Sequence, residues 1–424
     1  MRKHFISSPI NSRSGAPKSN RFTGFTSKNR SSTNNCSSRG RTAQNHSSST
    51  NDDEDNEYVD ERYRFVVPVD NCLLPLSTGW KYVEVKLLGS SRSLYFNVEA
   101  KRCCVSHLES FVAKETGVED PFLFGLAQIV DEEYRFLAAS TKLSKHAPKS
   151  WKSSSGWGTD IVGNPLLVLH YRVQVYIIDV YLLSGLTSLD YYYIQLRQNM
   201  LTRQWDSEAL PEALAFELTA VALQADYGDY TTAVENQDYF PPSDYFPPLI
   251  ISIRGQDYVK RHTPRLHADL AGLDRSTAKR QFVDELCRSR SAVNSHGHVF
   301  RRLSAKVEDT DAEAALIGVS MAGVQVFEVS NVVQYQIAEF AWPQISKVSF
   351  ERRKFSIASL DGRRYTFCSS SDEKAKYLLA YCQHVHQVAM RIQAHYSSTT
   401  TGALSDRSSL LSTPAEDGEF ESLF

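Results

Sequence analysis

The sequence predicts an α+β protein of several lobes, in which a β-grasp unit, a helical unit and a β-sandwich follow one another. Three observations predict this fold class. Strand-like alternation of apolar residues begins at Lys81, helical patterns rich in Leu, Ala and Tyr occupy the middle, and seven short strands precede one long helix near the end. A length of 424 residues provides for two to four such units.

The first 61 residues are predicted to be a disordered tail. Residues 1–50 carry nine Lys/Arg and no Asp/Glu, and an acidic run follows at residues 51–57. This composition, rich in Ser, Thr, Asn and Gly, buries too little apolar surface to offset chain entropy. Prolines and glycines interrupt any amphipathic helix, so we favour a solvated basic tail that contacts anionic lipid over a transit peptide.

Residues 62–173 are predicted to form the first lobe. Val83, Val85 and Leu87 share one face of a strand, and Leu94, Phe96 and Val98 repeat that face after a Gly-Ser-Ser turn, which indicates a β-hairpin. A helix follows, with a capping box from Ser106 to Glu109 and a stop at Gly117. Residues 122–130 and 134–137 have the character of strands, and residues 142–152 that of a lysine-rich loop.

Residues 174–296 are predicted to form a helical second lobe, with helices over residues 189–205, 212–225 and 277–287. The tandem repeat DYFPPSDYFPP at residues 238–248 contains too many prolines for a helix, and we expect a loop there.

Residues 297–395 are predicted to form the third lobe, a sandwich closed by a helix that begins after residues 370–371 and runs through Ile392. Residues 396–424, rich in Ser and Thr and acidic near the end, are predicted to be a second disordered tail. The seven expected strands cover residues 299–303, 315–319, 324–329, 333–340, 345–350, 354–358 and 364–367.

Several classes of protein are excluded by the sequence. The longest apolar stretch, residues 165–186, contains Arg172 and Asp179, and no signal-peptide core opens the chain, so we expect neither a membrane span nor secretion. Seven cysteines without a CxxC pair indicate reduced thiols in a cytoplasmic protein.

No catalytic motif accompanies these patterns. The sequence has no Cys followed by an Arg at the spacing of a phosphatase P-loop, no Walker lysine loop, no GxGxxG, no HExxH and no GxSxG, so we expect no enzymatic activity and no cofactor. Two His-x-His pairs, His296 with His298 and His384 with His386, are expected in a loop and on the last helix. Two ligands do not make a zinc site, so no metal is expected either.

The order of the lobes resembles the FERM domain of the band 4.1, ezrin, radixin and moesin family. The resemblance covers about residues 78–395. Within it, the amino-acid sequence is more similar to FERM domains of non-receptor tyrosine phosphatases and of willin-like adaptors than to ezrin. It implies a ubiquitin-like first lobe, an acyl-CoA-binding-protein-like helical second lobe and a PH/PTB-like third lobe. The stretches that carry it are FGLAQIVDEEYRFL, KLSKHAPKSWK, YYYIQLRQNML, LTAVALQADYGDY, RGQDYVKRHTPRLH, FAWPQISKVSFERRKFSI and RRYTFCSSSDEKAKYLLAYCQHVHQ.

The resemblance also implies a function and partners. It suggests an adaptor, peripheral at the plasma membrane, cell cortex or junctions and associated with the cytoskeleton, that binds cytoplasmic tails of membrane proteins and phosphoinositides rather than nucleic acid. A junctional signalling scaffold for a growth-control pathway, without direct cytoskeletal contact, is the alternative. The absence of an ezrin-like basic actin-binding tail from this sequence favours that alternative over direct actin binding.

Three sets of residues are candidates for binding. Lysines of one loop and basic residues between two strands of the third lobe suit a lipid headgroup, which the resemblance places in the cleft between the first and third lobes, although Ala138 and Ala139 stand where the family leads us to expect basic residues. An extended peptide can add to a strand beside the last helix, and a free carboxylate after Phe424 suits a PDZ groove. The lipid set is Lys142, Lys145, Lys149, Lys152, Arg352, Arg353 and Lys354; the groove set is Ile345, Ser346, Lys347, Val348, Ser349, Phe350, Tyr377, Tyr381 and His384; the PDZ-ligand set is Glu421, Ser422, Leu423 and Phe424.

Overall fold

The structure is a computed structural model, and the residues that it describes belong to one compact unit, Tyr58–Phe424. They are residues 64–403 except 73–74, 154–155, 204, 207–209, 231–238, 290, 303–313 and 331–332. The predicted N-terminal tail and the C-terminal tetrapeptide therefore lie outside the described residues.

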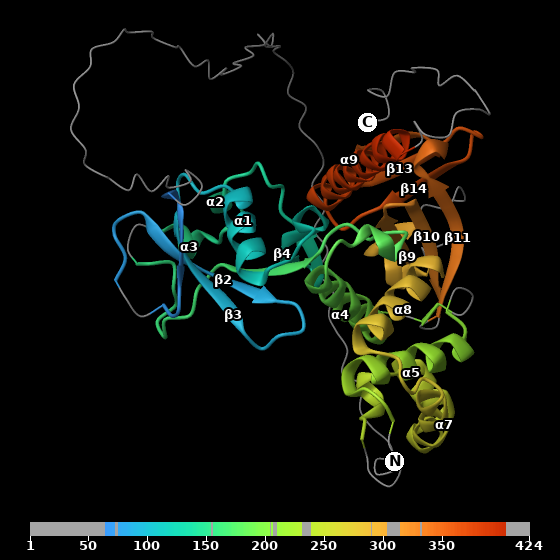
Figure 1. The fold of residues 1–424 in the computed structure, drawn as a ribbon. Coiled ribbons are helices and arrows are strands. Elements are labelled where there is room, and N and C mark those ends of the chain that lie inside the picture. Colours follow the sequence, from blue (N-terminus) through green and yellow to red (C-terminus); the bar gives the residue numbers. More distant parts are fainter. Residues whose placement is uncertain are drawn as a thin grey trace, which may run out of the picture. The chain divides into compact units, whose positions relative to one another are not determined.

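The first lobe is a six-stranded sheet with helix α1 (Val105–Thr116) packed against it (Figure 1). The predicted hairpin is confirmed, and Val83, Val85, Phe96 and Val98 are buried. Strands β2 and β6 run parallel at the centre of the sheet order β1-β3-β2-β6-β4-β5. The strands are β1 (Val66–Val69), β2 (Trp80–Leu87), β3 (Ser93–Glu99), β4 (Phe124–Val130), β5 (Glu133–Phe136) and β6 (Val168–Val173).

Two local predictions in this lobe are wrong. The capping box lies between Cys104 and His107, whose Nδ1 accepts from the Cys104 N–H at 3.3 Å. Glu109 instead accepts from the Leu126 N–H, and burial raises the pKa of Glu109 to about 7. The expected lysine loop contains two short helices, α2 (Leu143–His146) and α3 (Lys149–Lys152), because the buried side chains of Leu143 and Trp151 anchor them.

The second lobe contains helices α4 (Leu186–Thr202), α5 (Glu212–Tyr227), α6 (Pro248–Arg254), α7 (Gln256–Ala268) and α8 (Arg275–Arg288). The three predicted helices are confirmed as α4, α5 and α8. The sequence did not predict α6, because this helix begins at Pro248, the last residue of the proline-rich repeat. It did not predict α7, because Pro264 lies inside that helix and most of its residues are polar. Packing against α5 stabilises helix α7 although its local helix propensity is low, and Val259, Thr263 and His267 of α7 are buried.

All seven strands predicted for the third lobe are present. They join the short strand β7 (Trp205–Asp206) in the sheet order β12-β13-β14-β8-β9-β10-β11-β7. The bounds are β8 (His296–Arg302), β9 (Ala314–Ser320), β10 (Gly323–Ser330), β11 (Val333–Ala341), β12 (Ile345–Glu351), β13 (Lys354–Ser359) and β14 (Arg364–Cys368).

Helix α9 (Asp372–Ala403) packs against β12 and β13 (Figure 1). The helix begins within the predicted run of residues 370–373, and its cap is Ser371, whose Oγ accepts from the Lys374 N–H at 3.2 Å. The helix continues beyond Ile392 and beyond the expected lobe boundary at residue 395, because no Gly or Pro follows until Gly402. None of the described helices has both the length and the hydropathy to cross a bilayer.

Candidate functional site

The contact between the first and third lobes begins at a tight turn that joins β4 to β5. Asp131 and Glu132 occupy this turn with φ values of 53° and 64°, and Val130 pairs with Glu133 across it. Left-handed backbone at both central residues matches the twist of a two-residue hairpin. The turn therefore fixes Glu133 at the first position of β5.

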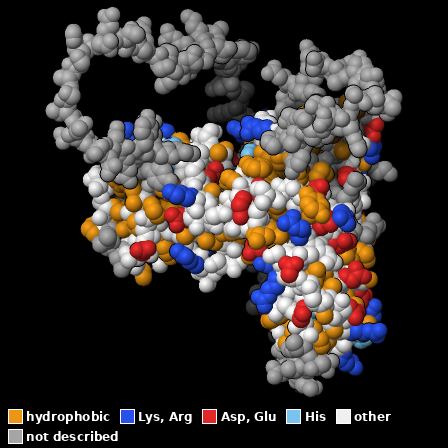
Figure 2. All heavy atoms as spheres, in the orientation of Figure 1, with side chains coloured by type: hydrophobic (Ala, Val, Ile, Leu, Met, Phe, Trp, Pro, Cys, Tyr) orange, Lys and Arg blue, Asp and Glu red, His pale blue; other side chains and the backbone are white. Residues whose placement is uncertain are grey.

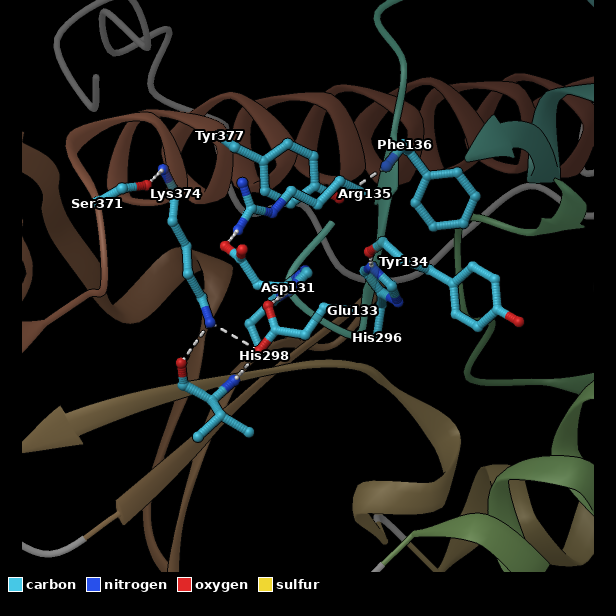
Figure 3. Close-up of polar contacts among 11 residues, drawn as sticks. Asp131, Glu133, Tyr134, Arg135, Phe136, His296, His298, Ser371, Lys374 and Tyr377 are labelled. Atoms are coloured by element: carbon cyan, nitrogen blue, oxygen red, sulfur yellow. Dashed lines mark hydrogen bonds and ion pairs between the residues drawn. The ribbon is translucent and has the colours of Figure 1, made fainter. Parts of the chain in front are cut away.

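The Glu133 carboxylate contacts two elements of the third lobe (Figure 3). One oxygen accepts from Lys374 Nζ at 2.7 Å and from the Val299 N–H at 2.9 Å, and the other accepts from His298 Nδ1 at 3.1 Å. Lys374 Nζ also donates to the Val299 carbonyl at 2.6 Å. Strand β8 and the first turn of α9 are thus joined to the first lobe through one carboxylate.

His296 and His298 lie on strand β8 and not in the expected loop. Both are buried, and as alternate residues of a strand they face the same side. His296 Nε2 donates to the Tyr134 carbonyl at 3.0 Å. Within the described ranges, no group of three or more His, Cys, Asp or Glu is arranged to hold a metal ion.

Burial and pairing shift the pKa values of these groups in opposite senses. Burial by itself would raise the pKa of Glu133, but its hydrogen bonds with His298, Lys374 and the Val299 N–H lower it to about 2. Burial lowers the pKa of His298 despite the opposing effect of Glu133. His298 is therefore neutral at pH 7, and the charge that compensates Glu133 belongs to Lys374.

Two residues of the predicted peptide groove also contact the first lobe. Tyr377 Oη accepts from the Phe136 N–H at 3.1 Å, and Tyr381 Oη donates to the Gln174 carbonyl. The rings of Tyr381 and Phe136 stack with centroids 5.9 Å apart and planes at 11°. The hydroxyls of Tyr377 and Tyr381 are therefore both engaged in contacts between lobes. We call these contacts the junction cluster: Glu133, Tyr134, Phe136, His296, His298, Lys374, Tyr377 and Tyr381.

The strand of the predicted groove lies at the end of its sheet. Strand β12 pairs with β13 along one edge, and its other edge pairs with no described strand. Ile345 and Val348 are buried, whereas Ser346, Lys347 and Phe350 are exposed, Phe350 by 39%. Ser349 and His384 are half-buried, and burial lowers the pKa of His384.

All seven residues of the predicted lipid set are exposed, but they lie on two lobes. The four lysines lie on and just before α2 and α3 of the first lobe. The other three surround the β12–β13 turn, where Arg352 has φ of 51° and Arg353 Nε donates to the Ser369 carbonyl at 3.0 Å. On the face drawn in Figure 2, basic and acidic side chains are interspersed over the described surface.

Sequence reasoning missed Glu133 and Lys374. The two residues are 241 positions apart, and although both lie in stretches that resemble the FERM family, no local pattern pairs them. The only local signal is the short polar interval between the two strand-like runs, which indicates a turn near Glu133. Nothing in the first turn of α9 distinguishes Lys374 from its exposed neighbour Lys376.

Comparisons with known proteins identify the family. Residues 180–296 match the FERM central domain, and residues 309–396 match the FERM C-terminal PH-like domain. The chain is 32% identical to protein expanded of Drosophila melanogaster over 75% of this chain and 27% of that protein. It is 28% identical to the human tyrosine-protein phosphatase non-receptor type 13 over 74% of this chain and 12% of that protein.

Solved structures share the fold. The crystal structure of the FERM and C-terminal domain complex of Drosophila Merlin superposes with a TM-score of 0.56 at 17% identity, covering 74% of this chain and 98% of that one. The present chain spans about a quarter or less of the two curated relatives named above. With its ubiquitin-like, helical and PH-like lobes in this order, the chain belongs to the FERM domain family of protein-binding adaptor modules.

Proposed function

We propose that this protein is a non-enzymatic adaptor that links cytoplasmic tails of membrane proteins and phosphoinositides at the cell cortex to cytoskeletal or junctional signalling complexes. The observation that carries the proposal is the edge of β12 beside α9, which pairs with none of the strands that the structure describes. An extended peptide gains affinity by pairing its backbone with such an edge and gains specificity from neighbouring side chains. Phe350, Lys347 and His384 are the side chains available there.

A phage-displayed peptide library selected against the full chain tests the peptide groove. Phe350→Ala should weaken binding of the selected peptides about tenfold, because burial of a Phe side chain contributes about 1.5 to 3 kcal/mol. Leu360→Ala is the matched control, since Leu360 is exposed in the next turn of the same lobe. Equal loss in both variants, or no loss in Phe350→Ala, would contradict the groove.

The lipid part of the proposal depends on the two exposed basic groups. Lysines of α2 and α3 and the basic β12–β13 turn offer charge to an anionic headgroup without having to break a buried ion pair. The PDZ-ligand set, Glu421 to Phe424, extends the proposal to PDZ-domain partners. A solved structure of human myosin 7b contains a MyTH4-FERM domain in complex with a harmonin-a PDZ domain, which supports only the general pairing of the two module types.

The alternative function is a junctional signalling scaffold for a growth-control pathway. The similarity to the FERM and PDZ domain-containing protein 2 of Mus musculus, whose name joins the two module types, supports the scaffold part of this alternative. Co-sedimentation of the full chain with filamentous actin separates the two functions. Direct sedimentation supports the cytoskeletal link, and its absence together with capture of PDZ-domain proteins supports the scaffold.

A further inference from the structure

A cavity of about 300 Å³ lies where the three lobes meet. The first lobe contributes Arg172 of β6, the second contributes Gln195, Gln198 and Arg203 at and after α4, and the third contributes His296 and Gly297 of β8. The cavity shares Glu133, Tyr134, Phe136 and His296 with the junction cluster, but most of its lining residues have no role in the contacts described above.

The two arginines bring positive charge into this cavity without a carboxylate partner. Arg172 is 8% exposed, donates to Gln198 Oε1 at 2.8 Å, and its guanidinium carbon lies 3.9 Å from the centroid of the Tyr134 ring. Arg203 is half-buried and donates to the Ala292 carbonyl at 2.6 Å. In the part of the chain that the structure describes, neither forms an ion pair, and burial lowers the pKa of both.

The acidic residues of the wall do not neutralise this charge. Glu133 is bound by Lys374, His298 and the Val299 N–H, and Glu132 is exposed at the rim. Since a buried cation without a counter-charge carries a large desolvation cost, the cavity favours an anion.

Gln195 adds a second and independent requirement. Its side chain is 1% exposed, and its Nε2 donates to Asn199 Oδ1 at 3.0 Å. Its Oε1 lies buried in the cavity wall and receives no hydrogen bond from any residue that the structure describes. A buried acceptor without a hydrogen bond destabilises the folded state, because it has lost its contact with water. A ligand that also carries a hydroxyl donor would remove this cost.

We propose that this cavity binds a phosphate group, either as inorganic phosphate or as the phosphate monoester of a small polyol. A tetrahedral oxyanion accepts from guanidinium groups that approach from different lobes, and monohydrogen phosphate or a polyol hydroxyl donates to Gln195 Oε1. A second cavity of about 540 Å³ shares Tyr134, Arg172 and Gln198 with the first and adds Lys86 and His170, which provides room for the rest of an ester.

Calorimetric titration of the full chain with inorganic phosphate, and with sulfate at matched ionic strength, tests the proposal. Sulfate has the shape and charge of monohydrogen phosphate but carries no hydroxyl at neutral pH. Phosphate should therefore bind more tightly than sulfate. Arg172→Gln and Arg203→Gln should each weaken phosphate binding about tenfold to a hundredfold, as expected when a hydrogen bond to a charged group is lost. Arg288→Gln, an exposed arginine of α8, should leave it unchanged.

Gln195→Leu keeps the test decisive if the arginine variants do not fold. It should abolish the preference for phosphate over sulfate while retaining affinity for both ions. Lys86→Gln should weaken binding of inositol trisphosphate but not of inorganic phosphate. Absence of phosphate binding to the full chain, or equal binding of phosphate and sulfate, would overturn the proposal.

Vesicles that contain a phosphoinositide distinguish the source of the phosphate. If the ligand is a lipid headgroup, inositol trisphosphate should release the chain from the vesicles, and Arg172→Gln should no longer sediment with them. If the ligand is a soluble phosphate ester, inositol trisphosphate should bind the chain while leaving sedimentation intact.

Discussion

The junction between the first and third lobes and the outer edge of the third lobe are both rich in charged and aromatic side chains, but they differ in burial. At the junction, Glu133 and Lys374 are paired and largely withdrawn from water. At the outer edge, Lys347, Phe350 and the β12–β13 turn face solvent. The difference teaches that residue type alone does not separate a binding surface from a structural contact; burial and pairing do.

The largest effect on stability is expected from Glu133→Gln. The substitution leaves Lys374, 5% exposed, without its carboxylate, and removal of one partner of a buried ion pair costs about 3 to 5 kcal/mol. Urea denaturation measures the free energy of unfolding. Glu132→Gln, in the same turn but exposed, should change it by less than about 0.5 kcal/mol, and equal effects of the two variants would erase the contrast between the regions.

Acid should weaken the junction by a comparable amount. Because the pKa of Glu133 is about 2 in the folded state and 4.5 ordinarily, its contribution of about 3 kcal/mol is present above pH 4.5 and lost as the pH falls toward 2. His298, whose pKa is lowered from 6.5, adds a loss that begins below pH 6.5. The free energy of unfolding of Glu133→Gln should therefore decline less between pH 4.5 and 2 than that of the unmodified chain.

Tyr381→Phe should have an intermediate effect on stability. It removes a hydroxyl that donates to the buried Gln174 carbonyl, which costs about 1 to 3 kcal/mol. Tyr335→Phe, at an exposed position of β11, is the control for loss of a tyrosine hydroxyl. Peptides selected on the full chain should bind Tyr381→Phe normally. A loss of peptide binding in this variant but not in the control would show that Tyr381 takes part in peptide binding.

Charge reversal of the basic surface should barely alter stability but should abolish lipid binding. Replacement of Lys142, Lys145, Arg353 and Lys354 by Glu affects exposed groups, each worth less than about 0.5 kcal/mol in unfolding. Attraction to an anionic membrane is screened over about 10 Å at 0.1 M salt, so sedimentation with phosphoinositide vesicles should also fall as salt rises. Retained sedimentation of the charge-reversed chain would place the lipid site elsewhere.

Changes in the PDZ-ligand set should not affect the stability of the lobes. In a C-terminal peptide, Phe424→Ala should weaken a PDZ complex by about 1.5 to 3 kcal/mol and Ser422→Ala by about 0.5 to 1.5 kcal/mol. Residues appended after Phe424 should be as damaging, since this binding mode requires the free carboxylate. Equal binding of the extended peptide to a panel of PDZ domains would show the ending to be a chance match.

The sequence by itself determined the order of the lobes, all seven strands of the third lobe, the first hairpin and three of the five helices of the second lobe. These elements could be predicted because each buries one face. Burial of one face spaces apolar residues at the strand or helix period along the sequence, as in Val83, Val85, Phe96 and Val98. Local patterns also located the start of α9 within residues 370–373 and Gly117 as the end of α1.

Tertiary structure alone decided which polar residues act together. The carboxylate of Glu133 meets Lys374 only because a tight turn and a helix cap bring residues 241 positions apart to one point. Helix α7 forms despite Pro264 because α5 covers its buried face. Folding likewise placed the groove candidate Tyr381 in a contact between lobes and left Arg172 and Arg203 facing a shared cavity. Such outcomes depend on partners distant in the chain, and no local periodicity encodes them.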